Sequence, residues 1–237
     1  AYGFRDQLQD TIGLKYLNPQ ILKNQIINNK ISHAYMFTGT RGTGKTTCAK
    51  ILARAVNCEN PQNGNPCNEC DTCKGILNGS LPDVYEIDAA SNNGVDNIRE
   101  LREDVIFTPA LAKYKVYIID EVHMLSTQAF NALLKTLEEP PEHIIFVFAT
   151  TEINKVPQTI LSRCQRFDFK RITVSDIAER LKYVAGCEKI ELSDSAANLI
   201  AKIADGAMRD ALSVLDRCIN GGDTVTLETV ENTVGIC

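Results

Sequence analysis

Apolar positions along the first two thirds of the chain follow two alternating patterns. Short apolar runs, typical of strands buried on both faces, alternate with stretches whose apolar residues recur at helical spacing. Alternating strands and helices predict an α/β fold with a parallel sheet flanked by helices. The predicted strands cover residues 34–38, 84–88, 115–119, 144–149 and, as an edge strand, 165–169. The predicted helices cover residues 18–28, 45–57, 95–106 and 126–138.

After about residue 170 the pattern is helical throughout. Thr173 and Ser193 stand at predicted helix starts, where a side-chain oxygen can cap free backbone N–H groups. We therefore predict an α/β domain over residues 1–170 and a small helical domain over residues 171–237. The predicted helices of the second domain cover residues 173–185, 193–205, 208–220 and 227–234, with Gly186, Gly206 and Gly221–Gly222 between or after them.

A glycine-rich loop joins the first predicted strand to the second predicted helix. Its glycines let the backbone curl so that successive N–H groups and the helix N-terminus hold a β-phosphate. Lys45 would reach the β- and γ-phosphates, and the Thr46 hydroxyl would ligate Mg²⁺. The strand–loop–helix context favours a P-loop that binds ATP over a chance glycine-rich turn. The predicted nucleotide-binding residues are Gly39, Thr40, Arg41, Gly42, Thr43, Gly44, Lys45, Thr46 and Thr47.

Two acidic residues, Asp120 and Glu121, follow the third predicted strand. Ligands of parallel sheets bind at the carboxyl ends of the strands, where these side chains would lie. We expect Asp120 to hold Mg²⁺, directly or through water, and Glu121 to act as the general base on the attacking water. Without the P-loop, the pair would be an ordinary solvated strand end.

Four cysteines within 16 residues, Cys58, Cys67, Cys70 and Cys73, lie in a polar segment rich in Asn, Pro and Gly. Their spacing fits a tetrahedral Cys₄ zinc site that would organise this excursion from the α/β core. A redox CxxC pair and an iron–sulfur cluster are the alternatives. The remaining cysteines are expected to be buried or incidental; they are Cys48, Cys164, Cys187, Cys218 and Cys237.

Three further residues have two interpretations each. Thr151 could hydrogen-bond the attacking water or cap a strand. Arg163 could be a catalytic group or a surface charge, and Arg209 could reach a phosphate or pair with a neighbouring acid. Composition does not separate these possibilities.

Composition and charge exclude some classes of protein. The chain has 237 residues, of which 44% are hydrophobic and 23% charged, as is usual for globular domains. It has no apolar run long enough for a membrane span, and its start has no apolar core of signal-peptide type. The net charge of −5 does not indicate a strongly basic nucleic-acid binder. Nine cysteines beside a P-loop are consistent with a reducing cytoplasm.

Together these motifs resemble the clamp-loader branch of the AAA+ ATPases, and more narrowly the ATPase subunits of the bacterial DNA polymerase III clamp loader. The similarity extends over about residues 21–235. It implies a AAA+ P-loop NTPase fold with a zinc-binding insertion at residues 58–73 and a helical lid domain at residues 171–237. The similarity is carried by His33–Tyr35, Gly39–Thr46, the four cysteines, and residues 86–91, 120–125, 131–141, 149–152, 160–164 and 209–213.

The resemblance assigns roles to the three ambiguous residues. Thr151 falls at the sensor 1 position. Arg163 falls at the arginine-finger position of a Ser-Arg-Cys motif, which in this family acts in trans on ATP held by a neighbouring subunit. Arg209 falls at the sensor 2 position and would act in cis. A finger stabilises the charge on the γ-phosphoryl oxygens, so supplying it from a neighbour ties hydrolysis to assembly.

The resemblance also implies the function of the whole protein. It would be an ATPase motor subunit of the DNA polymerase III holoenzyme that opens a sliding clamp and loads it on primed DNA. Its cofactors would be ATP, Mg²⁺ and Zn²⁺. Its partners would be the delta and delta-prime subunits, further copies of the ATPase subunit, the sliding clamp and primer–template DNA, with no membrane involved.

Two alternatives share this fold. A non-hydrolysing scaffold of the delta-prime kind would keep the cysteines and the Ser-Arg-Cys motif, but the complete P-loop, Glu121 and Thr151 argue against it. A branch-migration motor is the other alternative, and the cysteines and the Glu-Glu-Pro-Pro run at residues 138–141 argue against it.

Two features depart from the family pattern. The family begins with a basic Arg-x-x-Arg-Pro-x-x-Phe segment near the adenine pocket, followed by Asp-Val-Val-Gly-Gln, and only Asp10–Gly13 can be matched to this here. Base recognition by residues 1–20 is therefore not predicted. The family also has a third, collar domain that would follow residue 237, so we expect a fragment that does not form a stable oligomer alone.

Overall fold

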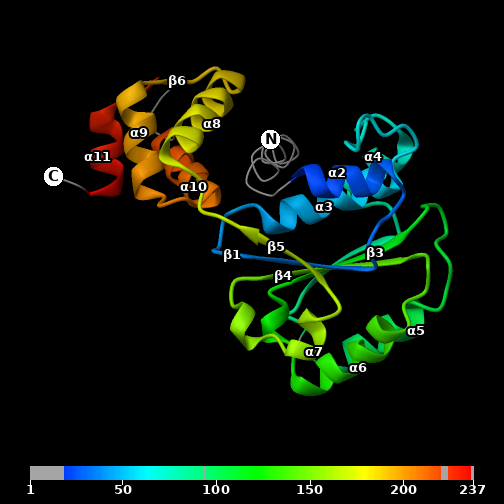
Figure 1. Cartoon of the computed structure of the whole chain (residues 1–237). Helices are drawn as coiled ribbons and strands as arrows, with labels where there is room; N and C mark the ends of the chain where they lie inside the picture. Colours follow the sequence, from blue (N-terminus) through cyan, green and yellow to red (C-terminus); the bar gives the residue numbers. More distant parts are fainter. Residues whose placement is uncertain (1–18, 93, 220–223, 236–237) are drawn as a thin grey trace. The chain divides into compact units, whose positions relative to one another are not determined.

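The computed structural model describes residues 19–92, 94–219 and 224–235, and its internal contacts divide it into two units. The first unit contains the described residues of 1–39 and 45–169, and the second contains those of 40–44 and 170–237. The first unit is a sheet with helices packed on it, and the second is mainly helical (Figure 1).

The first unit is built on a five-stranded sheet in the order β2-β3-β4-β1-β5. Every neighbouring pair of strands is parallel, so the predicted α/β class is confirmed. The predicted edge position of residues 165–169 is also confirmed, because this strand pairs on one side only. The strands are β1 (Ala34–Gly39), β2 (Val84–Asp88), β3 (Lys115–Asp120), β4 (Ile144–Thr150) and β5 (Gln165–Phe169).

Helices cover both faces of this sheet (Figure 1). One buried cluster joins the sheet to α2 and α3, and a second joins its other face to α5, α6 and α7. The α-helices are α2 (Pro19–Ile27), α3 (Lys45–Asn57), α4 (Asp71–Leu77), α5 (Val95–Asp104), α6 (Thr127–Glu138) and α7 (Gln158–Leu161). Two 3₁₀ turns, η1 (Val122–Met124) and η2 (Ile153–Lys155), follow β3 and β4.

The sequence of strand β4 is apolar throughout because the strand is buried on both faces. All seven of its residues are buried, because helices cover both faces of the sheet. Successive side chains point to opposite faces, so Phe146 and Phe148 enter the cluster with α6, whereas Ile145 and Val147 enter the cluster with α3. Truncating a core phenylalanine of this kind typically costs about 3–5 kcal/mol.

The strand register brings several carboxyl ends to one edge of the sheet. Thr38 of β1 pairs with Thr150 of β4, and Asp88 of β2 pairs with Asp120 of β3. Because parallel strands all end at the same edge, the residues after β1, β3 and β4 are neighbours there. This edge positions the candidate site.

The second unit contains four helices and a short parallel strand pair in the part of the chain that the structure describes. Thr173 and Ser193 cap helices as predicted, because their hydroxyls accept the backbone N–H groups of Asp176 and Ala196. The elements are α8 (Val174–Cys187), β6 (Glu191–Leu192), α9 (Asp194–Ile203), α10 (Met208–Ile219), β7 (Thr224–Val225) and α11 (Leu227–Val234).

One helix was not predicted, and one predicted boundary was wrong. Helix α4 begins within the cysteine-rich segment, and the Cys70 side chain caps that helix by accepting the Cys73 N–H. Helix α8 was expected to end before Gly186, but it continues through Gly186 to Cys187. A single glycine weakens a helix by only about 1 kcal/mol, so neighbouring packing can carry the helix past it.

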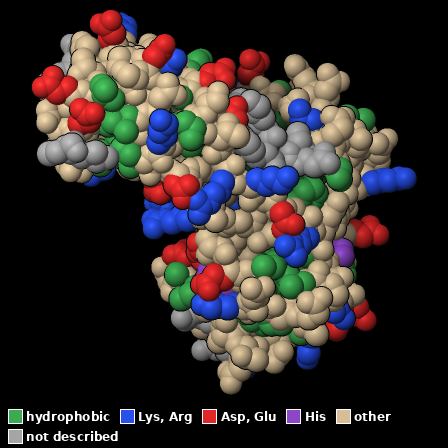
Figure 2. Space-filling model, turned by 60° about the vertical axis from the view of Figure 1, so that its left-hand side comes forward, with side chains coloured by type: hydrophobic (Ala, Val, Ile, Leu, Met, Phe, Trp, Pro, Cys, Tyr) green, Lys and Arg blue, Asp and Glu red, His purple; other side chains and the backbone are tan. Residues whose placement is uncertain are grey.

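Over the ranges that the structure describes, no helix is both long and apolar enough to cross a membrane. On the face drawn in Figure 2, acidic and basic side chains are interspersed and hydrophobic side chains form only small patches.

Candidate functional site

The glycine-rich loop connects the end of β1 to the start of α3. Gly39 has a φ of +150°, and a Cβ at this position would lie 2.4 Å from the carbonyl oxygen of Phe169. Gly44, directly before α3, has a φ of +91°, a backbone conformation that residues with a side chain rarely adopt. The loop therefore depends on glycine at both ends, and it places Lys45 as the first residue of α3.

The Lys45 side chain is buried beside the loop. Its ammonium donates a hydrogen bond to the carbonyl oxygen of Gly39 at 2.9 Å. Burial lowers the pKa of Lys45, and the nearby charges of Glu121 and Asp120 act in the opposite direction. A desolvated ammonium at a helix N-terminus is well suited to an anion, because the free N–H groups of α3 favour negative charge at the same place.

Thr46 and Asp120 face each other across the start of α3 and the end of β3. The Thr46 hydroxyl donates to Oδ2 of Asp120 at 2.5 Å, and Oδ1 of Asp120 accepts the N–H of Glu121 at 2.8 Å. One hydroxyl and one carboxylate oxygen thus lie together. Both are oxygen ligands of the kind that Mg²⁺ prefers.

Glu121 links the ends of β3 and β4. Its backbone is left-handed, with a φ of 46°, and this turns the side chain toward β4. Oε2 of Glu121 accepts the Thr151 hydroxyl at 2.9 Å and lies 3.4 Å from Nδ1 of His123. The structure therefore brings Lys45, Asp120, Glu121 and Thr151 together, although they lie up to about a hundred positions apart in the sequence.

The two arginines belong to other elements. Arg163 follows α7, and its guanidinium donates to the Glu138 carboxylate at 2.8 Å and to the Thr159 carbonyl oxygen at 2.8 Å. Arg209 is an exposed residue near the start of α10 in the second unit. Among the other loop residues, Arg41 is exposed, and the Thr43 hydroxyl donates to the carbonyl oxygen of Thr40 at 2.8 Å.

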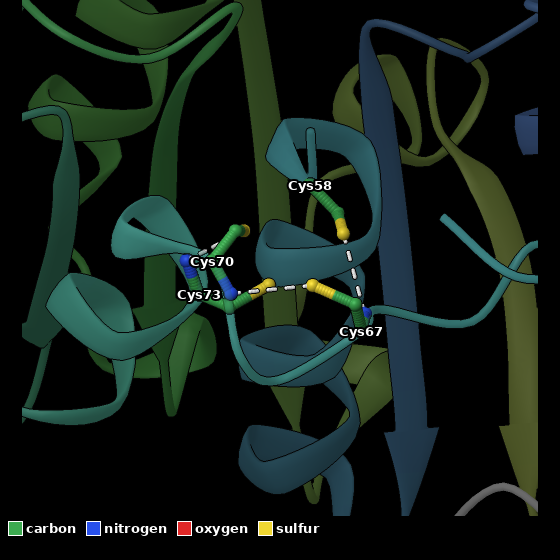
Figure 3. Close-up of side chains that lie close together, drawn as sticks. All are labelled: Cys58, Cys67, Cys70 and Cys73. Carbon is green, nitrogen blue, oxygen red and sulfur yellow. Dashed lines mark hydrogen bonds between the residues drawn. The ribbon is translucent and has the colours of Figure 1, made fainter. Parts of the chain in front are cut away.

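Of the four clustered cysteines, Cys58 directly follows α3, Cys67 and Cys70 precede α4, and Cys73 lies in the first turn of α4 (Figure 3). Their sulfur atoms are all within 4.8 Å of one another. The Sγ atoms of Cys58, Cys67 and Cys70 accept backbone N–H groups from Cys67, Cys70 and Cys73, respectively. Tetrahedral coordination with Zn–S bonds of about 2.3 Å requires sulfur atoms about 3.8 Å apart, so a small contraction would fit zinc.

The thiols differ in acidity. Backbone N–H groups of Glu69 and Cys70 lower the pKa of Cys67 to about 6. Burial raises the pKa of Cys73 and of Cys58. A metal ion binds the thiolate form, so its binding would overcome the effect of burial on these two thiols.

Of the other cysteines, Cys48 and Cys218 are buried, as expected of small apolar residues, and Cys187 is exposed. The matched segment Asp10–Gly13 and Cys237 lie outside the described residues. Sequence reasoning gave no role to two residues that now stand beside site residues, His123 and Glu138. The position of His123 two residues after Glu121, within the matched segment 120–125, was a signal that could have found it.

Comparison with known proteins identifies two family matches. A family described as "DNA polymerase III, delta subunit" matches residues 17–173. A second, described as "DNA polymerase III clamp loader subunit, ATPase lid domain", matches residues 176–224. The two matches together cover most of the chain.

Individual relatives agree with these matches. DNA polymerase III subunit tau of Bacillus subtilis is 57% identical over 227 residues, which is 95% of this chain and 40% of that protein. The tau subunit of Escherichia coli is 48% identical, over 85% of this chain and 31% of that protein. The gamma subunit of Buchnera aphidicola from Acyrthosiphon pisum is 44% identical, over 96% of this chain and 63% of that protein. The chain thus spans less than two thirds of each of these relatives.

Among solved structures, the RuvB Holliday junction branch migration motor of Thermotoga maritima has a similar fold. The TM-score is 0.67 at 20% identity, over 91% of this chain and 65% of that one. This similarity concerns the AAA+ fold alone. The chain belongs to the clamp loader ATPase family of DNA polymerase III, together with the gamma and tau subunits.

Proposed function

We propose that the chain is the ATP-binding and ATP-hydrolysing part of a motor subunit of the bacterial replicative clamp loader. The subunit would use ATP to open a sliding clamp and load it on primed DNA. One observation carries the proposal: Lys45, Thr46, Asp120, Glu121 and Thr151 converge at one edge of the sheet. Membership of the clamp loader family supports it.

Phosphate binding would use residues 39–47. Backbone N–H groups of the loop and of α3 would surround the β-phosphate, and Lys45 would exchange its bond with Gly39 for a phosphate oxygen. Thr46 and Asp120 would hold Mg²⁺, since their oxygens already lie 2.5 Å apart.

Hydrolysis would use Glu121 as the general base that takes a proton from the attacking water. The Thr151 hydroxyl, which donates to the same carboxylate, would help to orient that water. Both groups come from strand ends, so the sheet fixes their separation. Rigid elements position reacting groups more accurately than mobile loops do.

The two arginines would complete the charge stabilisation. Arg163 would act in trans on ATP bound to a neighbouring subunit, and its contact with Glu138 of its own chain is compatible with a group that serves another site. Arg209 would act in cis as the sensor 2 residue of a lid domain over residues 171–237. Residues 1–170 would form the nucleotide-binding domain.

The four-cysteine cluster would bind one structural zinc ion. Cys58, Cys67, Cys70 and Cys73 would supply all four ligands, which leaves no open position for catalysis. When bound, zinc would supply a crosslink between the end of α3 and the start of α4. The N–H groups that already point at the sulfur atoms would stabilise the thiolates.

The partners would be the delta and delta-prime subunits, further gamma or tau copies, the sliding clamp and primer–template DNA. Family membership indicates assembly within the DNA polymerase III holoenzyme, and the individual partners belong to this proposal. Hydrolysis in the cytoplasm would be triggered when a neighbouring subunit completes the site.

ATP binding tests the proposal directly. Lys45→Ala should weaken the affinity for a fluorescent ATP analogue by about 10- to 100-fold, as expected for losing a charge-assisted hydrogen bond. Lys50→Ala is a matched control on the same helix, because Lys50 is partly exposed and pairs with Glu86 at 2.9 Å. Unchanged affinity in the Lys45 variant would refute the assignment.

A further inference from the structure

The His123 ring lies between the ends of β3 and β4. It belongs to η1, which follows Glu121, and only 6% of its side chain is exposed. Its Nδ1 lies 3.0 Å from Oγ1 of Thr150 and 3.4 Å from Oε2 of Glu121. Its Nε2 lies 3.4 Å from Oε1 of Glu152. Polar atoms of three different side chains therefore surround the ring, which indicates that His123 does more than fill space.

These contacts lie on both sides of Thr151. Oγ1 of Thr150 accepts the backbone N–H of Glu152 at 3.0 Å, so Thr150 and Glu152 are already tied together. The His123 ring contacts both of them. The segment is thus fixed before and after Thr151, whose own hydroxyl donates to Glu121 at 2.9 Å.

The phosphate-binding side of the site depends on other contacts. Lys45 is held by the Gly39 carbonyl oxygen, and Thr46 is held by Asp120. Loss of the His123 ring would therefore disturb the hydrolytic pair, Glu121 and Thr151, more than the loop that binds phosphate.

We propose that His123 is a positioning residue for ATP hydrolysis. By holding Thr150 and Glu152, its ring keeps the Thr151 hydroxyl against the Glu121 carboxylate. The inference rests on the proposed ATPase function. His123 would thus act in hydrolysis although, in the contacts described above, it touches neither Lys45 nor Thr46.

Substitutions can separate the two nitrogen atoms of the ring. An asparagine side chain ends at the position of Nδ1, and a glutamine side chain reaches the position of Nε2. Nδ1 lies 3.0 Å from its partner, Thr150, whereas the contact of Nε2 with Glu152 is longer, at 3.4 Å. Asparagine should therefore replace histidine better than glutamine, and leucine should preserve only the volume.

The experiment compares His123→Ala, His123→Asn, His123→Gln and His123→Leu in the full-length protein assembled with its partner subunits. Steady-state kcat and KM for ATP, the affinity for an ATP analogue, and the thermal unfolding midpoint are measured. His123→Ala should lower kcat about tenfold while KM and affinity stay within about twofold, since one positioning hydrogen bond is lost. His123→Asn should recover most of the lost kcat, and His123→Gln and His123→Leu should not.

His143→Ala is the matched control. His143 lies just before β4, at the opposite end of that strand from Thr150, and its ring contacts the Val105 carbonyl oxygen. Its substitution should therefore leave kcat unchanged. Wild-type kcat in His123→Ala would overturn the proposal. So would a loss of kcat that parallels a loss of ATP affinity and of folding, with His123→Asn no better than His123→Leu. If Lys45→Ala hydrolyses ATP normally, the proposed function itself fails, whatever the His123 variants do.

Discussion

The Arg163 guanidinium pairs with the Glu138 carboxylate of its own chain, with Nη2 and Oε1 2.8 Å apart. Both side chains are partly exposed, so the pair stabilises the fold by at most about 1 kcal/mol. A weak contact of this kind can be exchanged for a stronger one. This is what a trans-acting arginine needs, because it must leave its own chain to reach a phosphate on a neighbour.

Arg163→Ala should therefore impair turnover without impairing nucleotide binding. We expect ATP turnover by the assembled complex to fall at least about a hundredfold, since arginine fingers commonly contribute more than this. The affinity of the variant subunit for ATP should stay within about twofold. Glu138→Ala is the control, and it should keep turnover within about fivefold, because only a surface pair is lost. Equal losses in both variants would contradict a specific role for Arg163.

The cysteine cluster predicts a metal content that can be measured by atomic absorption. The wild-type chain should hold about one zinc ion, and Cys70→Ser should lose it, because three thiolates bind zinc more weakly than four. Cys187→Ser should retain the metal, since Cys187 is an exposed cysteine outside the cluster. An iron–sulfur chromophore, or equal zinc content in all three proteins, would contradict the assignment.

Asp83 fastens the segment before β3. Its carboxylate accepts the backbone N–H groups of Ala110, Leu111 and Ala112 at 2.7, 2.7 and 2.8 Å, and the residue is almost fully buried. Asp83→Ala should lower the free energy of unfolding by about 3 kcal/mol, because it removes three hydrogen bonds to a charged carboxylate at once. Urea denaturation measures this value. A change below about 1 kcal/mol would show that the segment is held by other contacts.

Acid should destabilise the first unit in a defined pH range. Burial alone would raise the pKa of Asp104, but hydrogen bonds from Tyr117 and Lys115 and the Lys115 charge hold it below its usual value. The backbone N–H groups around Asp83 do the same for its pKa, again against the effect of burial. Because the unfolded carboxyls bind protons more readily, their stabilising contribution is complete above their ordinary pKa of about 3.9.

This contribution is lost as the pH falls from about 3.9 through the lower folded values. The free energy of unfolding, measured in urea between about pH 6 and 3, should therefore decrease toward acid. Asp104→Asn should flatten part of that decrease. A slope unchanged by this substitution would exclude Asp104 as one of the groups responsible.

Most of the architecture could be predicted because its signals are local. The apolar run at residues 144–149 must be buried on both faces, and the hydroxyls of Thr173 and Ser193 cap the helices that follow them. The P-loop motif also predicts which residues lie near it, because the parallel strands of one sheet end at the same edge and the end of β3 therefore lies beside the loop. The convergence of Lys45, Asp120 and Thr151 could therefore be anticipated.

The rest depends on contacts between distant residues. Nothing near His123 in the sequence shows that Thr150 and Glu152 surround its ring. The Arg163–Glu138 pair joins residues 25 positions apart through the packing of α6 and α7. Helix α4 was missed because its cap is a cysteine, a residue that does not ordinarily signal a helix start.

The central claim is that this chain hydrolyses ATP with Glu121 as the base. The most direct measurement is single-turnover ATP hydrolysis by the assembled clamp loader containing full-length wild-type or Glu121→Gln subunits, with ATP affinity measured in parallel. We predict that Glu121→Gln binds ATP within about twofold of wild type but hydrolyses it at least about a hundredfold more slowly, as expected for loss of a general base. Hydrolysis at the wild-type rate by the Glu121→Gln complex would contradict the account.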